Sequence, residues 1–149
     1  MSDLTHWDYP TPYTLPWMVT QEHIDHYKHV NNVAYLMQVE QLAWAHSNSL
    51  GLEFRDYQAC DRGMVIRRHE LDYVLPSHLG DTLQCATWIV ECDKRLSLTR
   101  RFQFVCERRN QTVFRAKTQF ICISLSDGKP KRMPESFQTI YGNAAIGQV

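Results

Sequence analysis

The sequence predicts an α+β fold in which a curved antiparallel sheet of about five strands wraps one long helix. Three observations support this prediction: one segment of helical periodicity, several long strand-like segments after it, and short polar turns between those segments. The 149 residues suit one domain, and a hydrophobic content of 44% supplies its core. We therefore expect a single domain over residues 1–149, with an irregular arm over 1–12 and a tail over 131–149.

The helix is predicted by apolar side chains that recur at helical spacing from Val33 to Leu50. Two asparagines precede this pattern. An asparagine is a good N-cap, because its side-chain oxygen accepts a hydrogen bond from a free amide of the first turn. Gly51 suits the end of the helix. We expect a helix of about four to five turns that begins at Asn31 or Asn32.

Strands are predicted on both sides of this helix. Residues 13–20 form a first strand, which Pro16 confines to a sheet edge or a bulge. A short helical or irregular piece over 53–61 precedes the remaining strands. Those strands cover residues 63–75, 81–92, 95–107 and 112–125. Short turns between them favour a meander of antiparallel neighbours, and the exposed sheet edges invite pairing with a second subunit.

Composition narrows the classes of protein. No apolar run is long enough to cross a membrane and the N-terminus does not resemble a secretory signal, so we expect a cytoplasmic protein with no membrane partner. The five cysteines form no C-x-x-C pair and are predicted to be reduced.

Charge is unevenly distributed along the chain. Residues 1–93 carry five Lys/Arg and thirteen Asp/Glu, a net −8, whereas residues 94–149 carry eleven and three, a net +8. The two halves neutralise each other on folding or pairing, although a few cations could serve a phosphate-bearing ligand. No nucleic-acid-binding motif accompanies the basic half, so we expect no nucleic acid partner.

A polar run, DHYKHVNNVAY, covers residues 25–35 where the helix is predicted to begin. Free amides of a first helical turn carry partial positive charge and stabilise a developing oxyanion. Asp25 lies seven residues before Asn32, in a loop that could fold back toward the helix. A carboxylate beside free amides is a hydrolytic arrangement, because the amides polarise a carbonyl while the carboxylate activates water or attacks directly. From spacing alone, turn and helix capping by Asp25, Asn31 and Asn32 is the preferred interpretation.

Other chemistries have less support. His23, His26 and His29 could suggest a metal site, but their spacing matches no standard zinc pattern and no cysteine lies nearby. Motifs of serine hydrolases, nucleoside-triphosphate binding and dinucleotide binding do not occur. We expect neither a metal nor a cofactor.

The polar run resembles the D-x-x-x-H-V-N-N-x-x-Y-L signature of hotdog-fold acyl-CoA thioesterases. These belong to the 4-hydroxybenzoyl-CoA thioesterase-like family, and the similarity is to its long-chain acyl-CoA branch. LDYVLPSHLGDTL, residues 71–83, is similar to the family's tyrosine–proline–glycine-aspartate segment. The resemblance covers roughly residues 13–130. It implies a hotdog fold, metal-free hydrolysis of acyl-CoA to free acid and CoA, and a dimer joined sheet edge to sheet edge. Such dimers often pair into tetramers, and their active sites lie at the dimer interface.

The resemblance also implies roles for single residues. Asp25 falls on the catalytic carboxylate, as general base or as nucleophile, and Asn32 on the residue whose main-chain amide polarises the thioester carbonyl. Some branches have glycine where Lys28 stands. Supporting positions that shape the loop and the helix are His29, Asn31, Tyr35 and Glu40.

Substrate contacts are less sharply predicted. CoA phosphates require basic residues near the cleft, although each candidate is also a plausible solvated strand residue. The candidates are Arg67, Arg68, Arg100 and Arg101, with Arg108, Arg109 and Lys117 as further choices. The aryl-CoA branch has neither His29 nor Asn31, which argues against a hydroxybenzoyl substrate.

Two alternatives stay open at this point. The aromatic arm, residues 6–17, could stack on a ligand, including a quaternary ammonium acyl group, or pack on its own sheet or a neighbouring subunit. The chain could also bind acyl-CoA or an acyl carrier without hydrolysing it.

Overall fold

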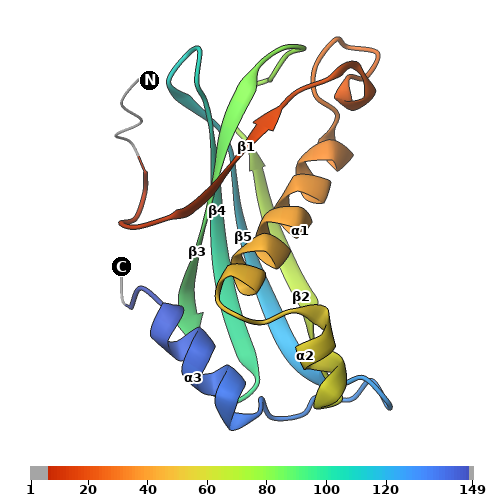
Figure 1. Ribbon diagram of the computed structural model, residues 1–149. Helices are drawn as coiled ribbons and strands as arrows, with labels where there is room; N and C mark the ends of the chain where they lie inside the picture. The colour runs from red at the N-terminus through yellow and green to blue at the C-terminus, as the bar shows by residue number, and fades with distance from the viewer. Residues whose placement is uncertain (1–6, 148–149) are drawn as a thin grey trace.

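A five-stranded antiparallel sheet curves around one long helix in the computed structural model, which describes residues 7–147 (Figure 1). The predicted arm and tail therefore lie partly outside the described residues. The elements are β1 (Tyr13–Met18), a 3₁₀ turn (Gln21–His23), α1 (Asn32–Ser49), α2 (Phe54–Ala59), β2 (Arg62–Tyr73), β3 (Thr82–Cys92), β4 (Ser97–Cys106), β5 (Gln111–Ser124) and α3 (Glu135–Ala144). The predicted α+β class, with one central helix and a curved sheet, is confirmed.

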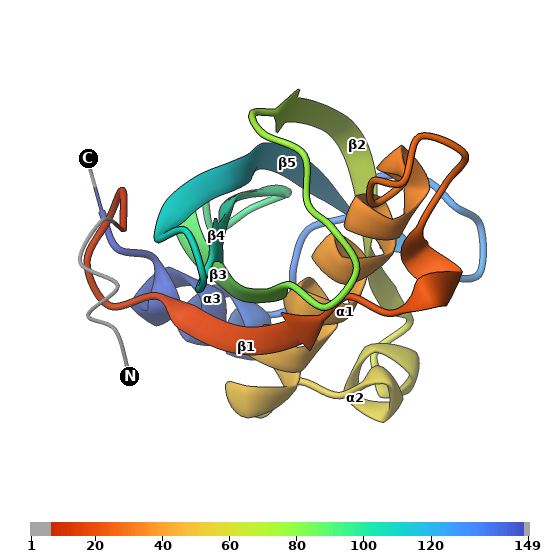
Figure 2. The same cartoon turned by 90° about the horizontal axis from the view of Figure 1, so that it is seen from above.

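The strand order is β1-β3-β4-β5-β2, so the predicted meander holds only for β3, β4 and β5. β2 pairs with β5 and β1 pairs with β3, which makes β1 and β2 the two edges of the sheet. The prediction that β2 and β3 are neighbours was wrong. The connection over residues 74–81 is not a tight turn but crosses the end of the curved sheet (Figure 2). Its Ser77 carbonyl accepts a hydrogen bond from Val30 N at 2.9 Å, which ties this crossing to the residues before α1.

The main core lies between α1 and the concave face of the sheet. Val39 and Leu42 of the helix are buried against Phe102, Phe104 and Phe114 of β4 and β5. Side chains alternate between the two faces of a strand, so Phe102 and Phe104, two positions apart on β4, both face the helix. This packing fixes the position of α1 relative to the sheet and hence of the loop before it.

The tail contains α3, a helix that the weak pattern of this segment did not predict. Its sequence includes Thr139 and Gly142, which have low helix propensity. Phe137 and Tyr141 are nevertheless buried in a second core cluster with Leu98. Tertiary packing therefore stabilises a helix that local propensity does not favour.

The first described residues of the aromatic arm, 7–9, pack on the convex face of their own sheet. The rings of Trp7 and Tyr9 contact Trp88 edge-on, with centroids 6.1 and 5.3 Å away. Asp8 forms an ion pair with Arg115, with the closest N–O distance 2.7 Å. This arrangement supports the packing alternative for the arm.

All five cysteines are free thiols, as predicted. Among the described helices, none combines the length and apolar character needed to span a membrane.

Candidate active site

The loop over residues 24–31, here called the Asp25 loop, folds back on itself in front of α1. Asp25 N donates to the His29 carbonyl at 2.9 Å, and an isolated β-bridge joins Ile24 to Val30. One oxygen of the half-buried Asp25 carboxylate accepts from Tyr27 N at 2.8 Å. The turn also explains a family preference, because Lys28 has φ of 66°, the left-handed region that favours glycine.

The first turn of α1 has two free amides. Asn31 is the N-cap, and its side-chain oxygen accepts from Ala34 N at 2.9 Å. Its side-chain amide donates to the His23 carbonyl at 3.1 Å, which holds the cap in place. No hydrogen-bond acceptor for the amides of Asn32 and Val33 is found among the described residues. They are available to an oxygen that carries developing negative charge.

Two tyrosines brace the start of the helix. The Tyr35 hydroxyl donates to Ser77 Oγ at 3.1 Å, and its ring stacks on Phe114. Burial raises the pKa of Tyr35, so this phenol stays protonated. The Tyr73 hydroxyl donates to the Asn32 carbonyl at 3.3 Å. The helix start is thus anchored to β2 and to the crossing before β3.

The other flank of the Asp25 loop meets a cluster of charged residues. The ring of His29 packs edge-on against His78, with centroids 5.1 Å apart. The buried Asp81 carboxylate is paired with Arg108 at 3.1 Å, and Arg109 Nη2 donates to the Pro76 carbonyl at 2.6 Å. Arg108 and Arg109 therefore hold the crossing before β3.

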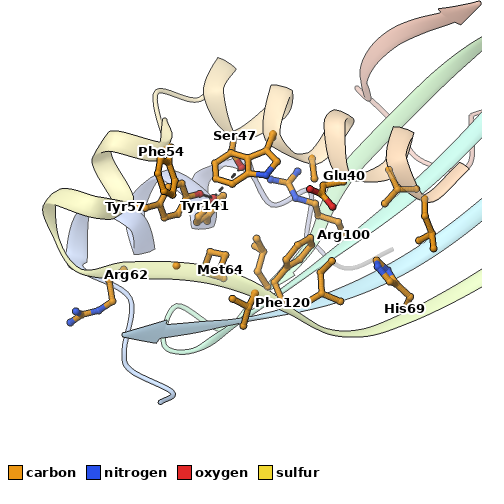
Figure 3. Close-up of a pocket in the computed structure, with 18 of the residues that line it drawn as sticks. Glu40, Ser47, Phe54, Tyr57, Arg62, Met64, His69, Arg100, Phe120 and Tyr141 are labelled. Atoms are coloured by element: carbon orange, nitrogen blue, oxygen red, sulfur yellow. Dashed lines mark hydrogen bonds between the residues drawn. The ribbon is translucent and has the colours of Figure 1, made fainter. Parts of the chain in front are cut away.

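A pocket of about 540 Å³ lies between α1 and the sheet (Figure 3). Its walls are mainly apolar and include Leu36, Met37, Trp44, Phe54, Met64 and Phe120. It begins at Val33, which also carries one of the free amides. Met37 and Ile66 line it while 59% and 46% exposed, so the pocket is open on the side of α1 and β2. An apolar chain would find most of its surface covered here.

Glu40 of α1 and His69 of β2 enter the pocket from opposite walls (Figure 3). His69 Nδ1 lies 2.8 Å from Thr118 Oγ1. Burial lowers the pKa of His69, while the charge of Glu40 opposes this effect. The pocket therefore contains one carboxylate of its own, whereas Asp25 is not among the residues that line it.

The inner end of the pocket is polar, a feature that the sequence analysis missed. Arg100 is 2% exposed and contacts His46 and Ser47 of α1. The hydroxyls of Tyr57 and Tyr141 are hydrogen-bonded to each other at the same end. A signal was present, because Arg100 occupies an inward position between Leu98 and Phe102 in the alternation of β4.

The structure divides the candidate CoA-binding arginines. Arg67 and Arg68 are exposed on the edge strand β2. Arg101 lies on the convex face, where its guanidinium is 6.0 Å from the Tyr9 ring. Arg100 is buried at the inner end of the pocket. Of these four arginines, only Arg67 and Arg68 face solvent next to the open side of the pocket.

Within residues 7–147, no group of three His, Cys, Asp or Glu side chains is placed to hold a metal ion. His23 instead caps a turn, since its Nδ1 accepts from Thr20 N at 2.9 Å.

Solved structures share this architecture at low sequence identity. The hypothetical protein SAV2348 from Staphylococcus aureus, in complex with CoA, matches with a TM-score of 0.85 and 19% identity over 97% of this chain and 90% of its own. The 1,4-dihydroxy-2-naphthoyl-CoA thioesterase Slr0204 from Synechocystis matches with a TM-score of 0.79 and 19% identity over 89% and 97%. YbaW, a probable thioesterase from Escherichia coli, matches with a TM-score of 0.73 and 25% identity over 86% and 96%.

These likenesses confirm the predicted hotdog fold. By sequence, no curated protein matches the chain. Residues 19–140, most of the chain, match the thioesterase-like superfamily. The chain belongs to this superfamily.

Proposed function

We propose that the protein hydrolyses acyl-CoA thioesters to a free carboxylic acid and CoA. The observation that carries this proposal is the pair of free amides on Asn32 and Val33, which lies between the Asp25 loop and an apolar pocket. Membership of the thioesterase-like superfamily supports the reaction class. Membership of the long-chain acyl-CoA branch stays a prediction.

In the proposed reaction, the thioester carbonyl oxygen accepts a hydrogen bond from the free amide of Asn32. The helix fixes this amide before the substrate arrives, so the amide stabilises the tetrahedral oxyanion without reorganisation. Asp25 either takes a proton from the attacking water or attacks the carbonyl carbon itself, forming a mixed anhydride that water then cleaves. The carbon–sulfur bond breaks and CoA leaves as a thiolate. The pKa of an ordinary thiol is about 8.5, so departure needs no strong acid.

We propose supporting roles for the remaining site residues. Asn31 caps the helix and sets the direction of its amides, Tyr35 anchors the helix start, and His29 supports the loop through His78. Exposed Arg67 and Arg68 are the cations that we assign to CoA phosphates. Glu40 acts on the part of the substrate that lies in the pocket, and not on the thioester at the first turn of α1.

We also propose a homodimer that joins through β2. Within residues 7–147, no strand pairs with the outer edge of β2, and Val65 and Ile66 expose apolar surface there beside the open side of the pocket. Pairing of two such edges would extend the sheet and cover the pocket. A tetramer would require a second contact between two of these dimers.

The central experiment measures thiol release from short-, medium-, long-chain and aryl acyl-CoAs by the full chain and by Asp25→Asn. We expect Asp25→Asn to lose at least about 100-fold in kcat, because the general base or nucleophile is removed while asparagine can still accept from Tyr27 N. Asp127→Asn is the matched control, since Asp127 makes the same turn contact, with Lys129 N at 2.8 Å, in an exposed loop.

Near-wild-type release by Asp25→Asn would contradict the catalytic assignment. No release from any acyl-CoA, together with measurable acyl-CoA binding, would favour the alternative of a binding protein on the same fold.

A further inference from the structure

Arg100 is a buried cation whose contacts are all neutral. Its side chain is 2% exposed, and its guanidinium donates to His46 Nδ1 at 2.6 Å and to Ser47 Oγ at 2.8 Å. The hydroxyl of Tyr141 also interacts with it, and the ring of Phe120 lies 6.0 Å from its central carbon. Among the residues that the structure describes, no carboxylate forms an ion pair with Arg100.

These contacts satisfy hydrogen bonds but leave the charge uncompensated. Burying a guanidinium is unfavourable unless an opposite charge accompanies it, and arginine stays protonated in proteins. A purely structural role, in which Arg100 ties α1 to β4 and α3, would account for the hydrogen bonds. It would not account for a buried cation placed on the wall of a mainly apolar pocket of about 540 Å³.

Arg100 lies at the opposite end of the pocket from the free amides of α1. Its partner Ser47 lies fifteen residues beyond Asn32 on the same helix, a distance of about 22 Å along the axis at about 1.5 Å per residue. The pocket runs along this stretch from Val33 to Ser47. A thioester carbonyl at the first turn would therefore place the far end of a long acyl chain beside Arg100.

We propose that the pocket is built for acyl groups with a carboxylate at the far end, and that Arg100 pairs with this carboxylate. The proposal rests on the function proposed above and names its substrate class. Guanidinium and carboxylate form two parallel charge-assisted hydrogen bonds, and the neighbouring hydroxyls of Ser47, Tyr57 and Tyr141 can donate to the same group.

Glu40 adds a selection for chain length among acyl groups that end in a carboxylate. It lines the pocket between the helix start and Arg100, six residues or about 9 Å before His46 along α1. Its negative charge repels an anionic end that stops there, while the cation beyond it attracts one that reaches further. The substrate class is therefore long-chain, with the carboxylate at the chain terminus.

The test compares thioesters that are matched in length. CoA release is measured for hexadecanedioyl-CoA against hexadecanoyl-CoA and for dodecanedioyl-CoA against dodecanoyl-CoA. We expect the wild-type kcat/KM to favour the dicarboxylic member by at least about tenfold, more strongly in the longer pair. Arg100→Met should abolish this preference, and Arg100→Lys should keep part of it, because the charge remains but the bidentate geometry is lost. Arg95→Met, an exposed arginine between β3 and β4, is the control.

Direct binding separates this proposal from the proposed hydrolysis. Calorimetry of the wild-type protein with free hexadecanedioic acid and with hexadecanoic acid needs neither turnover nor a variant. Tighter binding of the diacid, without thiol release from any ester, would overturn the hydrolysis and support the pocket assignment. Equal binding of the two acids, or equal kcat/KM for the two wild-type esters, would overturn the pocket assignment even if Arg100→Met fails to fold.

Discussion

Arg100 Nη1 lies 2.6 Å from His46 Nδ1, so a permanently charged guanidinium donates to an imidazole. Nδ1 must then be the unprotonated nitrogen, and the hydrogen of the neutral ring resides on Nε2. Burial and, to a smaller extent, the charge of Arg100 lower the pKa of His46 from 6.5 to about 4. Protonation of His46 would place two cations in contact inside the protein.

This contact predicts a pH dependence of stability. Above pH 6.5 the imidazole is neutral in both the folded and the unfolded state. As the pH falls from 6.5 to about 4, the unfolded state binds a proton that the folded state excludes, so stability is lost over this window. The full loss is up to about 3 kcal/mol. Urea unfolding of wild type and His46→Gln at pH 7.5 and 4.5 isolates the effect. Equal pH dependence in the two proteins would contradict it.

The N-cap of α1 should contribute to both stability and turnover. We expect Asn31→Ala to lower the free energy of unfolding by about 1 kcal/mol, because the Ala34 amide loses its acceptor. The same change should lower kcat several-fold, since the cap orients the free amides of Asn32 and Val33. Asn48→Ala, in the last turn of the same helix, is the control and should cost little in either measurement. A loss of stability without any change in kcat would limit Asn31 to a structural role.

The two carboxylates near the proposed reaction can be separated by substitution. Glu40 lines the pocket and Asp25 lies in the loop before the first turn of α1. We therefore expect Glu40→Gln to lower kcat less than about tenfold, compared with the loss of at least about 100-fold in Asp25→Asn. Steady-state thiol release on one acyl-CoA decides between them. The reverse ranking would transfer the catalytic role to Glu40.

The edge of β2 should mediate assembly. We expect a wild-type dimer by sedimentation, and a monomer for Ile66→Glu, because the new charges would face each other across a paired apolar edge. Met18→Glu places the same charge on β1, the opposite edge of the sheet, and should leave the dimer intact. A wild-type monomer, or dissociation by Met18→Glu alone, would exclude the β2 contact.

Local sequence patterns were sufficient for most elements. Helical spacing and an asparagine cap predicted α1 to within about one residue, because both signals are contained in neighbouring residues. Strand-like alternation predicted the five strands within about two residues at each end, and the polar run located the loop before the helix. The capping role of Asn31 could be predicted for the same reason.

The order of the strands and the inner end of the pocket depended on contacts between distant residues. β2 pairs with β5 and forms the edge of the sheet opposite β1, and no local pattern specifies which strand will be its neighbour. α3 folds because Phe137 and Tyr141 find a second core, which its own helix propensity does not indicate. The environment of Arg100 is set only by the packing of β4, α1 and α3, which brings His46, Ser47 and Tyr141 around its guanidinium.

The sequence by itself determined α1, the five strands, the helix cap and the position of the loop before the helix, because each of these depends on interactions within a short stretch of chain. Only the tertiary structure decided the strand order, the open pocket and the unpaired charge of Arg100. Burial and charge compensation are properties of the whole packed molecule, and a guanidinium at an alternating strand position is solvated or desolvated according to what folds over it.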